Sequence, residues 1–301
     1  MEIKTYAVVD FGTNSARLML AKVQNGAIIS TKKQLKTIRL GEKMTEGRIT
    51  DAAMQRASDA LTEFLVIAQN ENAIKFYAFA TSAVREAENT QDFLSHIKEN
   101  CNVDVDVITG DSEADIGFLG ASSGKSGRLG LIDIGGGSTE VVIGENGKIE
   151  YAKSFKVGTV RLLQMFPDAS PEDQNEYRAC QQHILSVFAD LPKDICPDVW
   201  LGIGGTGTAL AAIDQRLKVY DPDKVDGYAM AQSRLNALAK QLRGMTLAER
   251  KALTGLDDKR ADVIVYGALL MQTFTEQVGA NGYTACESDN LEGYLLKKIR
   301  P

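Results

Sequence analysis

Histidine and cysteine are scarce in this chain of 301 residues. There are only 2 histidines, His96 and His183, and 4 cysteines, which lie far apart without a C-x-x-C pair. Both histidines fall in segments with the pattern of an ordinary helix, so the sequence argues against a Ser-His-Asp triad and against a metal site built on histidine. The scattered cysteines favour reduced thiols, with neither a zinc site nor a disulfide framework.

Long apolar runs and an excess of positive charge are also missing. No apolar stretch approaches the roughly 20 residues that span a membrane, and the first residues lack a secretory leader. The formal net charge of −6 argues against broad nucleic-acid binding. We therefore expect a cytoplasmic protein whose partners include neither a membrane nor a nucleic acid. This charge still allows an anionic ligand in a locally basic groove.

Strands and helices alternate along the chain, which predicts an α/β protein. Residues 4–40 read as strand, loop, strand, hairpin and strand, followed by a helix that begins near Asp51. The second half repeats this order after a small, polar joint at 122–127. We expect two domains with a cleft between them, residues 1–121 and 122–301, with the last helix able to pack back on the first domain. Other expected elements are a strand at 103–109 and helices at about 91–100, 159–166, 171–190, 260–276 and 289–299.

The most informative feature is a repeated segment. VVDFGTNS at residues 8–15 returns as LIDIGGGST at residues 131–139. In both copies an apolar run ends in aspartate, passes through glycine and small polar residues, and leads to a second apolar run. Each copy then reaches an Asn-Gly pair, at residues 25–26 and 146–147. This pair is a strong hairpin signal because both residues tolerate positive φ.

The repeated loops have the composition of phosphate-binding loops. Glycine allows close backbone approach, neighbouring N–H groups point at one spot, and Asn, Ser and Thr side chains add donors. Asp10 and Asp133 stand at the strand ends and are expected to hold a divalent cation through water, because Mg²⁺ keeps much of its hydration. A single copy could equally be an ordinary glycine turn, and it is the duplication that favours phosphate. The loop residues concerned are Gly12, Thr13, Asn14, Ser15, Gly135, Gly136, Gly137, Ser138 and Thr139.

These loops resemble those of the exopolyphosphatase/guanosine pentaphosphate phosphohydrolase family, which belongs to the actin-like superfamily. The loops alone indicate the superfamily, and the motifs that contain Arg85 and Glu113 are specific to the family. The resemblance implies two duplicated actin-like domains of ribonuclease H-like fold, and it implies homodimers. Further motifs in family order are RLGE at 39–42, TSAVR at 81–85, G-x-x-EA at 110–114, G-x-x-RL at 158–162, GIGGT at 202–206 and RADVI at 260–264.

The resemblance also implies roles for two carboxylates. Glu113 matches the catalytic base that activates water, a role that suits a carboxylate in the first turn of a helix. Glu140 matches a second active-site carboxylate, which either helps to position water or joins the magnesium shell; on a strand it also fits an ordinary outward-facing residue. The chain departs from the family at Ser112, where a glutamate is usual, and at Leu291, which replaces the arginine of an Arg-Glu-Gly motif.

Basic residues and a third loop complete the expected site. Arg85 matches a phosphate-contacting arginine, whose guanidinium fork suits a polyanion. Arg17 is expected either to contact phosphate or simply to lie at the rim of the cleft. Gly205 and Thr206 correspond to the superfamily loop on the nucleoside side of the ligand. A basic run along one strand is usually a solvated face, although it could guide an anionic chain: Lys32, Lys33, Lys36 and Arg39.

Together these motifs predict a magnesium-dependent phosphoanhydride hydrolase. Inorganic polyphosphate, shortened from its end, is the first substrate expected. Guanosine pentaphosphate is the alternative, because it also presents a terminal phosphate. Two readings from other classes remain: a phosphotransferase of the same superfamily, and a non-catalytic binder of polyphosphate or alarmone.

Overall fold

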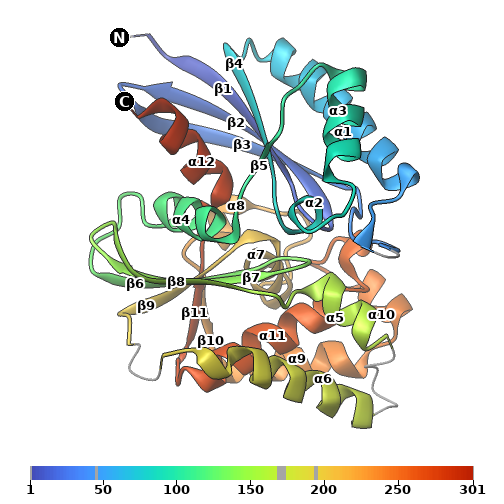
Figure 1. The fold of residues 1–301 in the computed structure, drawn as a ribbon. Coiled ribbons are helices and arrows are strands. Elements are labelled where there is room, and N and C mark those ends of the chain that lie inside the picture. The colour runs from blue at the N-terminus through green and yellow to red at the C-terminus, as the bar shows by residue number, and fades with distance from the viewer. Residues whose placement is uncertain (1, 45–46, 168–173, 193–195, 301) are drawn as a thin grey trace. The chain divides into compact units, whose positions relative to one another are not determined.

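The computed structural model describes residues 2–44, 47–167, 174–192 and 196–300 (Figure 1). The chain forms two compact units, one of residues 1–120 together with 290–301, the other of residues 121–289. Each unit has its own mixed sheet covered by helices, so the predicted α/β class is confirmed. In the described part of the chain, no helix combines the length and apolarity needed to cross a membrane.

The first unit is built on a five-stranded sheet with the order β3-β2-β1-β4-β5. The first three strands along the chain pair antiparallel, whereas β4 and β5 join β1 in parallel. Its strands are β1 (Lys4–Phe11), β2 (Ser15–Gln24), β3 (Ala27–Thr37), β4 (Lys75–Ala80) and β5 (Asp106–Val107). Its helices are α1 (Asp51–Asn70), α2 (Ser82–Arg85), α3 (Thr90–Cys101), α4 (Gly110–Ala121) and α12 (Asn290–Ile299).

Both faces of this sheet are buried, because β1 and β2 carry consecutive apolar residues and successive side chains point to opposite faces. Val9 and Leu18 pack with α1 and α3, while Val8 and Met19 pack on the other face with α12. As expected, α1 begins at Asp51, and the Thr50 side chain caps it by accepting the amide of Ala53. The last helix therefore belongs to the core of the first unit, although it lies at the opposite end of the sequence.

The second unit has a six-stranded sheet with the order β10-β11-β9-β6-β7-β8. The meander β6-β7-β8 is antiparallel, and β9 and β11 extend it in parallel from β6. Its strands are β6 (Arg128–Ile134), β7 (Thr139–Glu145), β8 (Lys148–Phe155), β9 (Val199–Ile203), β10 (Ala229–Ala231) and β11 (Gly282–Ala285). Its helices are α5 (Thr159–Met165), α6 (Gln174–Val187), α7 (Gly204–Asp214), α8 (Pro222–Val225), α9 (Gln232–Gly244), α10 (Leu247–Lys251) and α11 (Ile264–Gln277), with 3-10 turns at Phe188–Asp190 and Asp258–Arg260.

Both predicted hairpin turns are confirmed. Asn25 and Gly26 have φ of 54° and 76°, and Asn146 and Gly147 have φ of 51° and 80°. Each pair joins two antiparallel strands directly, because positive φ at both turn positions matches the twist of the strands. The internal repeat is therefore a repeat of structure.

Three expected elements differ from the structure. The strand predicted over 103–109 is only β5, which ends at Val107 because its partner β4 ends at Ala80. The helix predicted over 260–276 begins at Ile264, since residues 258–260 form a separate 3-10 turn. The helix predicted over 171–190 is α6 followed by a 3-10 turn at 188–190; residues 171–173 lie outside the described part.

Candidate active site

The two repeated loops close with the same hydrogen bond. The Gly12 amide donates to the Ser15 carbonyl at 3.0 Å, and the Gly135 amide donates to the Ser138 carbonyl at 3.0 Å. A Cβ on either glycine would lie 3.2 Å from that same oxygen. Two loops that share composition also share their backbone closure, so the repeat preserves a particular turn.

The carbonyl groups of the second loop all point into the second unit. The amide of Thr159 donates to the Gly135 carbonyl at 3.0 Å, and the amides of Val160 and Arg161 donate to the Gly136 carbonyl at 2.8 and 3.1 Å. The Arg161 Nε donates to the Gly137 carbonyl at 2.9 Å. With the Ser138 carbonyl already bonded, the N-terminal end of α5 occupies the remaining acceptors of the loop.

The carbonyl groups of the first loop are also hydrogen-bonded, in this case by backbone amides from elsewhere in the first unit. The Thr13 carbonyl accepts the amide of Gly41 at 2.9 Å. The Asn14 carbonyl accepts the amides of Ile38 and Arg39 at 3.0 and 2.8 Å. This segment after β3 thus holds the first loop as α5 holds the second.

Bound carbonyls turn the loop amides toward the opposite side, because C=O and the following N–H are antiparallel in a trans peptide. Among the described residues, the amides of Asn14, Gly136, Gly137 and Ser138 donate to no protein acceptor. Successive amides on one side of a loop form a concave anion-binding nest. Each loop is therefore arranged to receive phosphate oxygens.

Two threonines expected to contact phosphate use their hydroxyl groups differently. Thr139 is fully buried, and its hydroxyl donates instead to the Val157 carbonyl at 2.7 Å. Thr206, also buried, donates instead to the Ile134 carbonyl at 2.8 Å. Both hydroxyl groups therefore stabilise backbone segments next to the second loop by hydrogen bonds. The sequence alone could not assign these donors, because their acceptors lie on other elements.

Gly204 and Gly205 lie against charged side chains of the second unit. Gly204 has a φ of +67°, and a Cβ there would be 2.3 Å from the Asp133 Oδ1. A Cβ on Gly205 would lie 2.4 Å from the Arg260 Nη1. Parallel pairing places Asp133 opposite Ile203, so the ends of β6 and β9 bring the second and third loops together.

Arg17 pairs with Asp10. The two residues lie directly opposite in β1 and β2, and the Arg17 Nη2 and Nε approach the Asp10 Oδ2 at 2.6 and 3.1 Å. Their side chains are 18% and 6% exposed. Arg17 thus neutralises the carboxylate beside the first loop. This ion pair was not among the roles expected for Arg17 from the sequence.

Glu140 occupies the position in the second copy that Arg17 occupies in the first. It lies directly opposite Asp133 in β6 and β7, so the two carboxylates share one face of the sheet. Glu140 is 2% exposed, and its Oε1 accepts the Ser154 hydroxyl at 2.7 Å. The outward-facing alternative for Glu140 is therefore wrong.

Glu113 and Arg85 meet in the first unit. The Arg85 Nη1 donates to the Glu113 Oε2 at 2.8 Å and to the Ile108 carbonyl at 3.0 Å. Glu113 is 6% exposed and lies in the first turn of α4, where the Thr109 hydroxyl accepts the amide of Ser112 at 3.1 Å. Both residues follow the carboxyl ends of β4 and β5, the edge at which open α/β sheets bind ligands.

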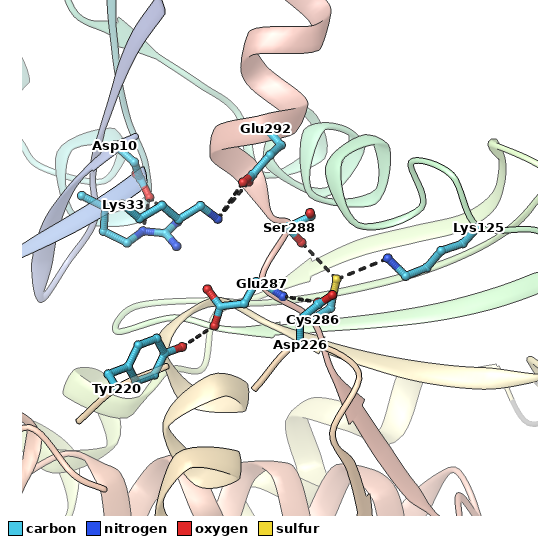
Figure 2. A network of polar contacts seen from close by, with 10 residues as sticks. Asp10, Lys33, Lys125, Tyr220, Asp226, Cys286, Glu287, Ser288 and Glu292 are labelled. Atoms are coloured by element: carbon cyan, nitrogen blue, oxygen red, sulfur yellow. Dashed lines mark hydrogen bonds and ion pairs between the residues drawn. The ribbon is translucent and has the colours of Figure 1, made fainter. Parts of the chain in front are cut away.

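The basic run on β3 is divided between the two faces of the sheet. Lys32 and Lys36 pair with Glu71 and Glu63, whereas Lys33 pairs with Glu292 of α12 at 2.9 Å (Figure 2). Each of these lysines already has a carboxylate partner in its own unit. The run is therefore not one basic surface along the strand.

The described residues contain no cluster of three or more His, Cys, Asp or Glu side chains that could hold a metal ion. The donors present beside the loops are the carboxylates of Asp10, Asp133 and Glu140. Hard oxygen donors in small number fit Mg²⁺, which is commonly bound by one or two carboxylates together with water and phosphate oxygens. The residue types therefore fit the expected ion.

Sequence reasoning gave no role to Gly158, Arg161 or Ser154. A Cβ on Gly158 would lie 2.5 Å from the Gly136 carbonyl group, so only glycine allows α5 to approach the loop. The sequence signal that could have identified Gly158 and Arg161 was their G-x-x-R spacing after the second hairpin. Ser154 gave no signal, because its partner Glu140 is reached only through the register of β7 and β8.

Two α/β units with matching amide-lined loops define a phosphate-handling protein of the actin-like class. The sequence pattern of the Ppx/GppA phosphatase family matches residues 19–300. The chain therefore belongs to the Ppx/GppA phosphatase family. This membership confirms the resemblance and the expected class of enzyme, an exopolyphosphatase-type hydrolase acting on acid anhydrides.

Similar proteins cover nearly the whole chain. Exopolyphosphatase 2 of Mycobacterium tuberculosis is 30% identical, over 98% of this chain and 99% of its own length. The crystal structure of an exopolyphosphatase from Cytophaga hutchinsonii superposes with a TM-score of 0.89 at 31% identity, over 98% of each chain. A guanosine-5'-triphosphate,3'-diphosphate pyrophosphatase of Vibrio campbellii is 28% identical, over 98% of this chain and 59% of its own length. The expected two-domain actin-like fold is confirmed by these likenesses.

Proposed function

We propose that the protein releases the terminal phosphate of inorganic polyphosphate by a magnesium-dependent attack of water. The observation that carries this proposal is the partly buried contact of 2.8 Å between Arg85 and Glu113. It puts a carboxylate, the type of group that accepts a proton from water, beside a guanidinium, the type of group that binds a phosphate oxygen. The similarity to exopolyphosphatases supports the same substrate.

Glu113 is the general base in this proposal. Its place in the first turn of α4 favours negative charge, because the helix dipole is positive at that end. Arg85 fixes the orientation of the carboxylate through Oε2 and is itself held by the Ile108 carbonyl. A fixed carboxylate can orient a water in line with the terminal P–O bond, and this positioning accounts for much of the rate in phosphoryl transfer.

Each repeated loop would bind phosphate oxygens through its own amides. The proposed donors are the amides of Asn14 in the first loop and of Gly136, Gly137 and Ser138 in the second, with the Asn14, Ser15 and Ser138 side chains. In the second unit, Asp133 and Glu140 would hold the magnesium ion, which supplies positive charge to the phosphate oxygens when bound. In the first copy Arg17 already supplies one positive charge to Asp10.

Guanosine pentaphosphate is the second candidate substrate. The same arrangement of base and amides would serve its terminal phosphate, and the similarity to the Vibrio pyrophosphatase favours it. We further propose a homodimer in the cytoplasm. A mass near twice the 32.7 kDa of the chain in light scattering would support the dimer.

The test is phosphate release from polyphosphate and from guanosine pentaphosphate with Glu113→Gln. We expect kcat to fall at least about 100-fold, the usual effect of removing a general base. Asp111→Asn is the matched control, because it removes an exposed carboxylate from the same helix turn and should leave activity unchanged. Full activity in Glu113→Gln would refute the mechanism. Tight binding without hydrolysis by the wild type would favour the non-catalytic binder, and transfer from ATP to an acceptor would favour the phosphotransferase.

A further inference from the structure

We propose that Arg161 is a positioning residue for the second phosphate loop, and that it acts by keeping the peptide group between Gly137 and Ser138 in one orientation. The contact is the hydrogen bond of 2.9 Å from the Arg161 Nε to the Gly137 carbonyl. This inference rests on the proposed binding of phosphate by the second loop.

The second loop needs such a constraint because it contains consecutive glycines. Gly135, Gly136 and Gly137 have no Cβ, and glycine populates positive and negative φ with similar ease. A peptide group in such a segment can rotate so that C=O and N–H exchange sides. After rotation, the Gly137 carbonyl would face the phosphate in place of the Ser138 amide, and an attractive dipole would become a repulsive one.

Backbone amides already prevent this rotation at the preceding peptides. The Gly135 carbonyl is held by the Thr159 amide, and the Gly136 carbonyl is held by the amides of Val160 and Arg161. Both restraints come from the first residues of α5 and require no particular side chain. For the Gly137 carbonyl, the donor that the structure shows is the Arg161 side chain. Arg161 therefore completes a row of restraints that the helix begins.

In the first loop, the equivalent carbonyl group is fixed by backbone amides and needs no side-chain donor. There the residue equivalent to Gly137 is Asn14, whose carbonyl accepts the amides of Ile38 and Arg39 at 3.0 and 2.8 Å. Asn14 also carries a side chain, which narrows its choice of φ and ψ. The two loops thus reach the same orientation, and only the glycine-rich copy depends on an arginine.

The proposal is tested by a pair of substitutions that differ in one property. Arg161→Gln places a neutral N–H donor the same number of bonds from Cα as the arginine Nε, whereas Arg161→Met keeps similar length and provides no donor. We expect kcat/KM for polyphosphate to fall about tenfold or more in Arg161→Met, as for a lost hydrogen bond to a charged group. Arg161→Gln should stay within about threefold of the wild type, because an N–H donor is retained.

Charge and folding are controlled separately. Arg178→Met removes an exposed arginine from α6 of the same unit and should leave kcat/KM unchanged. If Arg161 acted through long-range attraction of the anion, the Gln and Met variants would lose activity equally, and this outcome would overturn the proposal. Equal activity of wild type and Arg161→Met would also overturn it. Unchanged midpoints of thermal unfolding would exclude a folding defect as the cause.

A second readout does not require hydrolysis. Peptide rotation on the microsecond-to-millisecond scale broadens amide NMR signals, so relaxation dispersion at the Ser138 amide should appear in Arg161→Met and be absent from the wild type and Arg161→Gln. If the wild type binds tripolyphosphate but hydrolyses nothing, the proposed function fails while this test still decides the role of Arg161. If Arg161→Met shows the same Ser138 signal as the wild type, the positioning role fails even where hydrolysis is confirmed.

Discussion

Arg17 lies directly opposite Asp10 across β1 and β2, and its Nη2 contacts the Asp10 Oδ2 at 2.6 Å in a mostly buried ion pair. The same register in the second unit places Glu140 opposite Asp133. The two copies of the repeat therefore agree in backbone but differ in charge. One copy presents a neutralised carboxylate and the other presents two carboxylates on one face, so cation binding should depend mainly on the second copy.

The first prediction concerns magnesium. Asp133→Asn should raise the Mg²⁺ concentration for half-maximal activity about tenfold or more, because it removes a hard, charged oxygen donor. Asp10→Asn should raise it less, since Arg17 already balances that carboxylate. Magnesium titrations of phosphate release, compared with binding of the ion by calorimetry, measure both. Equal shifts in the two variants would contradict the asymmetry.

The second prediction concerns the coupling between Arg85 and Glu113. Arg85→Lys keeps the charge but replaces the planar guanidinium, whose Nη1 donates to both Glu113 and the Ile108 carbonyl, by an ammonium of different shape and reach, so kcat/KM should fall about 100-fold. In a double-mutant cycle with Glu113→Gln, the two losses should be far from additive, by about 1–3 kcal/mol in activation free energy. Arg48→Lys alters an exposed ion pair with Asp92 and should be silent. Additive losses would show that Arg85 and Glu113 act independently and would contradict the prediction.

The third prediction concerns the close approach at Gly158. Gly158→Ala would place a Cβ 2.5 Å from the Gly136 carbonyl group, and backbone must move to relieve this contact. We expect the free energy of unfolding to fall by about 1–3 kcal/mol and KM for polyphosphate to rise. In α9, a Cβ on Gly244 would meet nothing within 4 Å, so Gly244→Ala should change stability by less than about 1 kcal/mol. Urea unfolding measures both, and equal effects would refute the steric reason.

The fourth prediction is a pH dependence of stability at Asp106. Partial burial raises the pKa of Asp106, but hydrogen bonds from Lys298 and Tyr294 and the charge of Lys298 outweigh it and leave the pKa below its usual value. This interaction stabilises the fold above the unfolded pKa of about 4 and is lost as pH falls through the lower folded pKa.

Asp106→Asn measures that contribution. Because the Asp106 side chain is 53% exposed, we expect a loss of only about 0.5 kcal/mol at neutral pH. The difference from the wild type should shrink as pH falls below about 4. Urea unfolding across this range checks the result, with Asp104→Asn, in a more exposed pair with Lys98, as the control. A difference that stays constant at low pH would rule out ionisation as its cause.

Local features were predictable from sequence because their causes are local. The turns at 25–26 and 146–147 followed from Asn-Gly chemistry, and the start of α1 at Asp51 followed from its cap and apolar spacing. Where the structure differs, the cause lies in a neighbouring element. The strand expected over 103–109 ends already at Val107 because β4 ends at Ala80, which no pattern within 103–109 records.

The sequence by itself determined the repeat, the α/β order, the family and the residue types beside the loops. Only the tertiary structure decided which of these residues meet. Strand register paired Arg17 with Asp10 but set Glu140 beside Asp133, and packing between separate elements joined Arg85 to Glu113 and Arg161 to the Gly137 carbonyl. The physical reason is that turns and helix starts depend on nearby residues, whereas contacts across the chain depend on how sheets and helices bury their apolar faces.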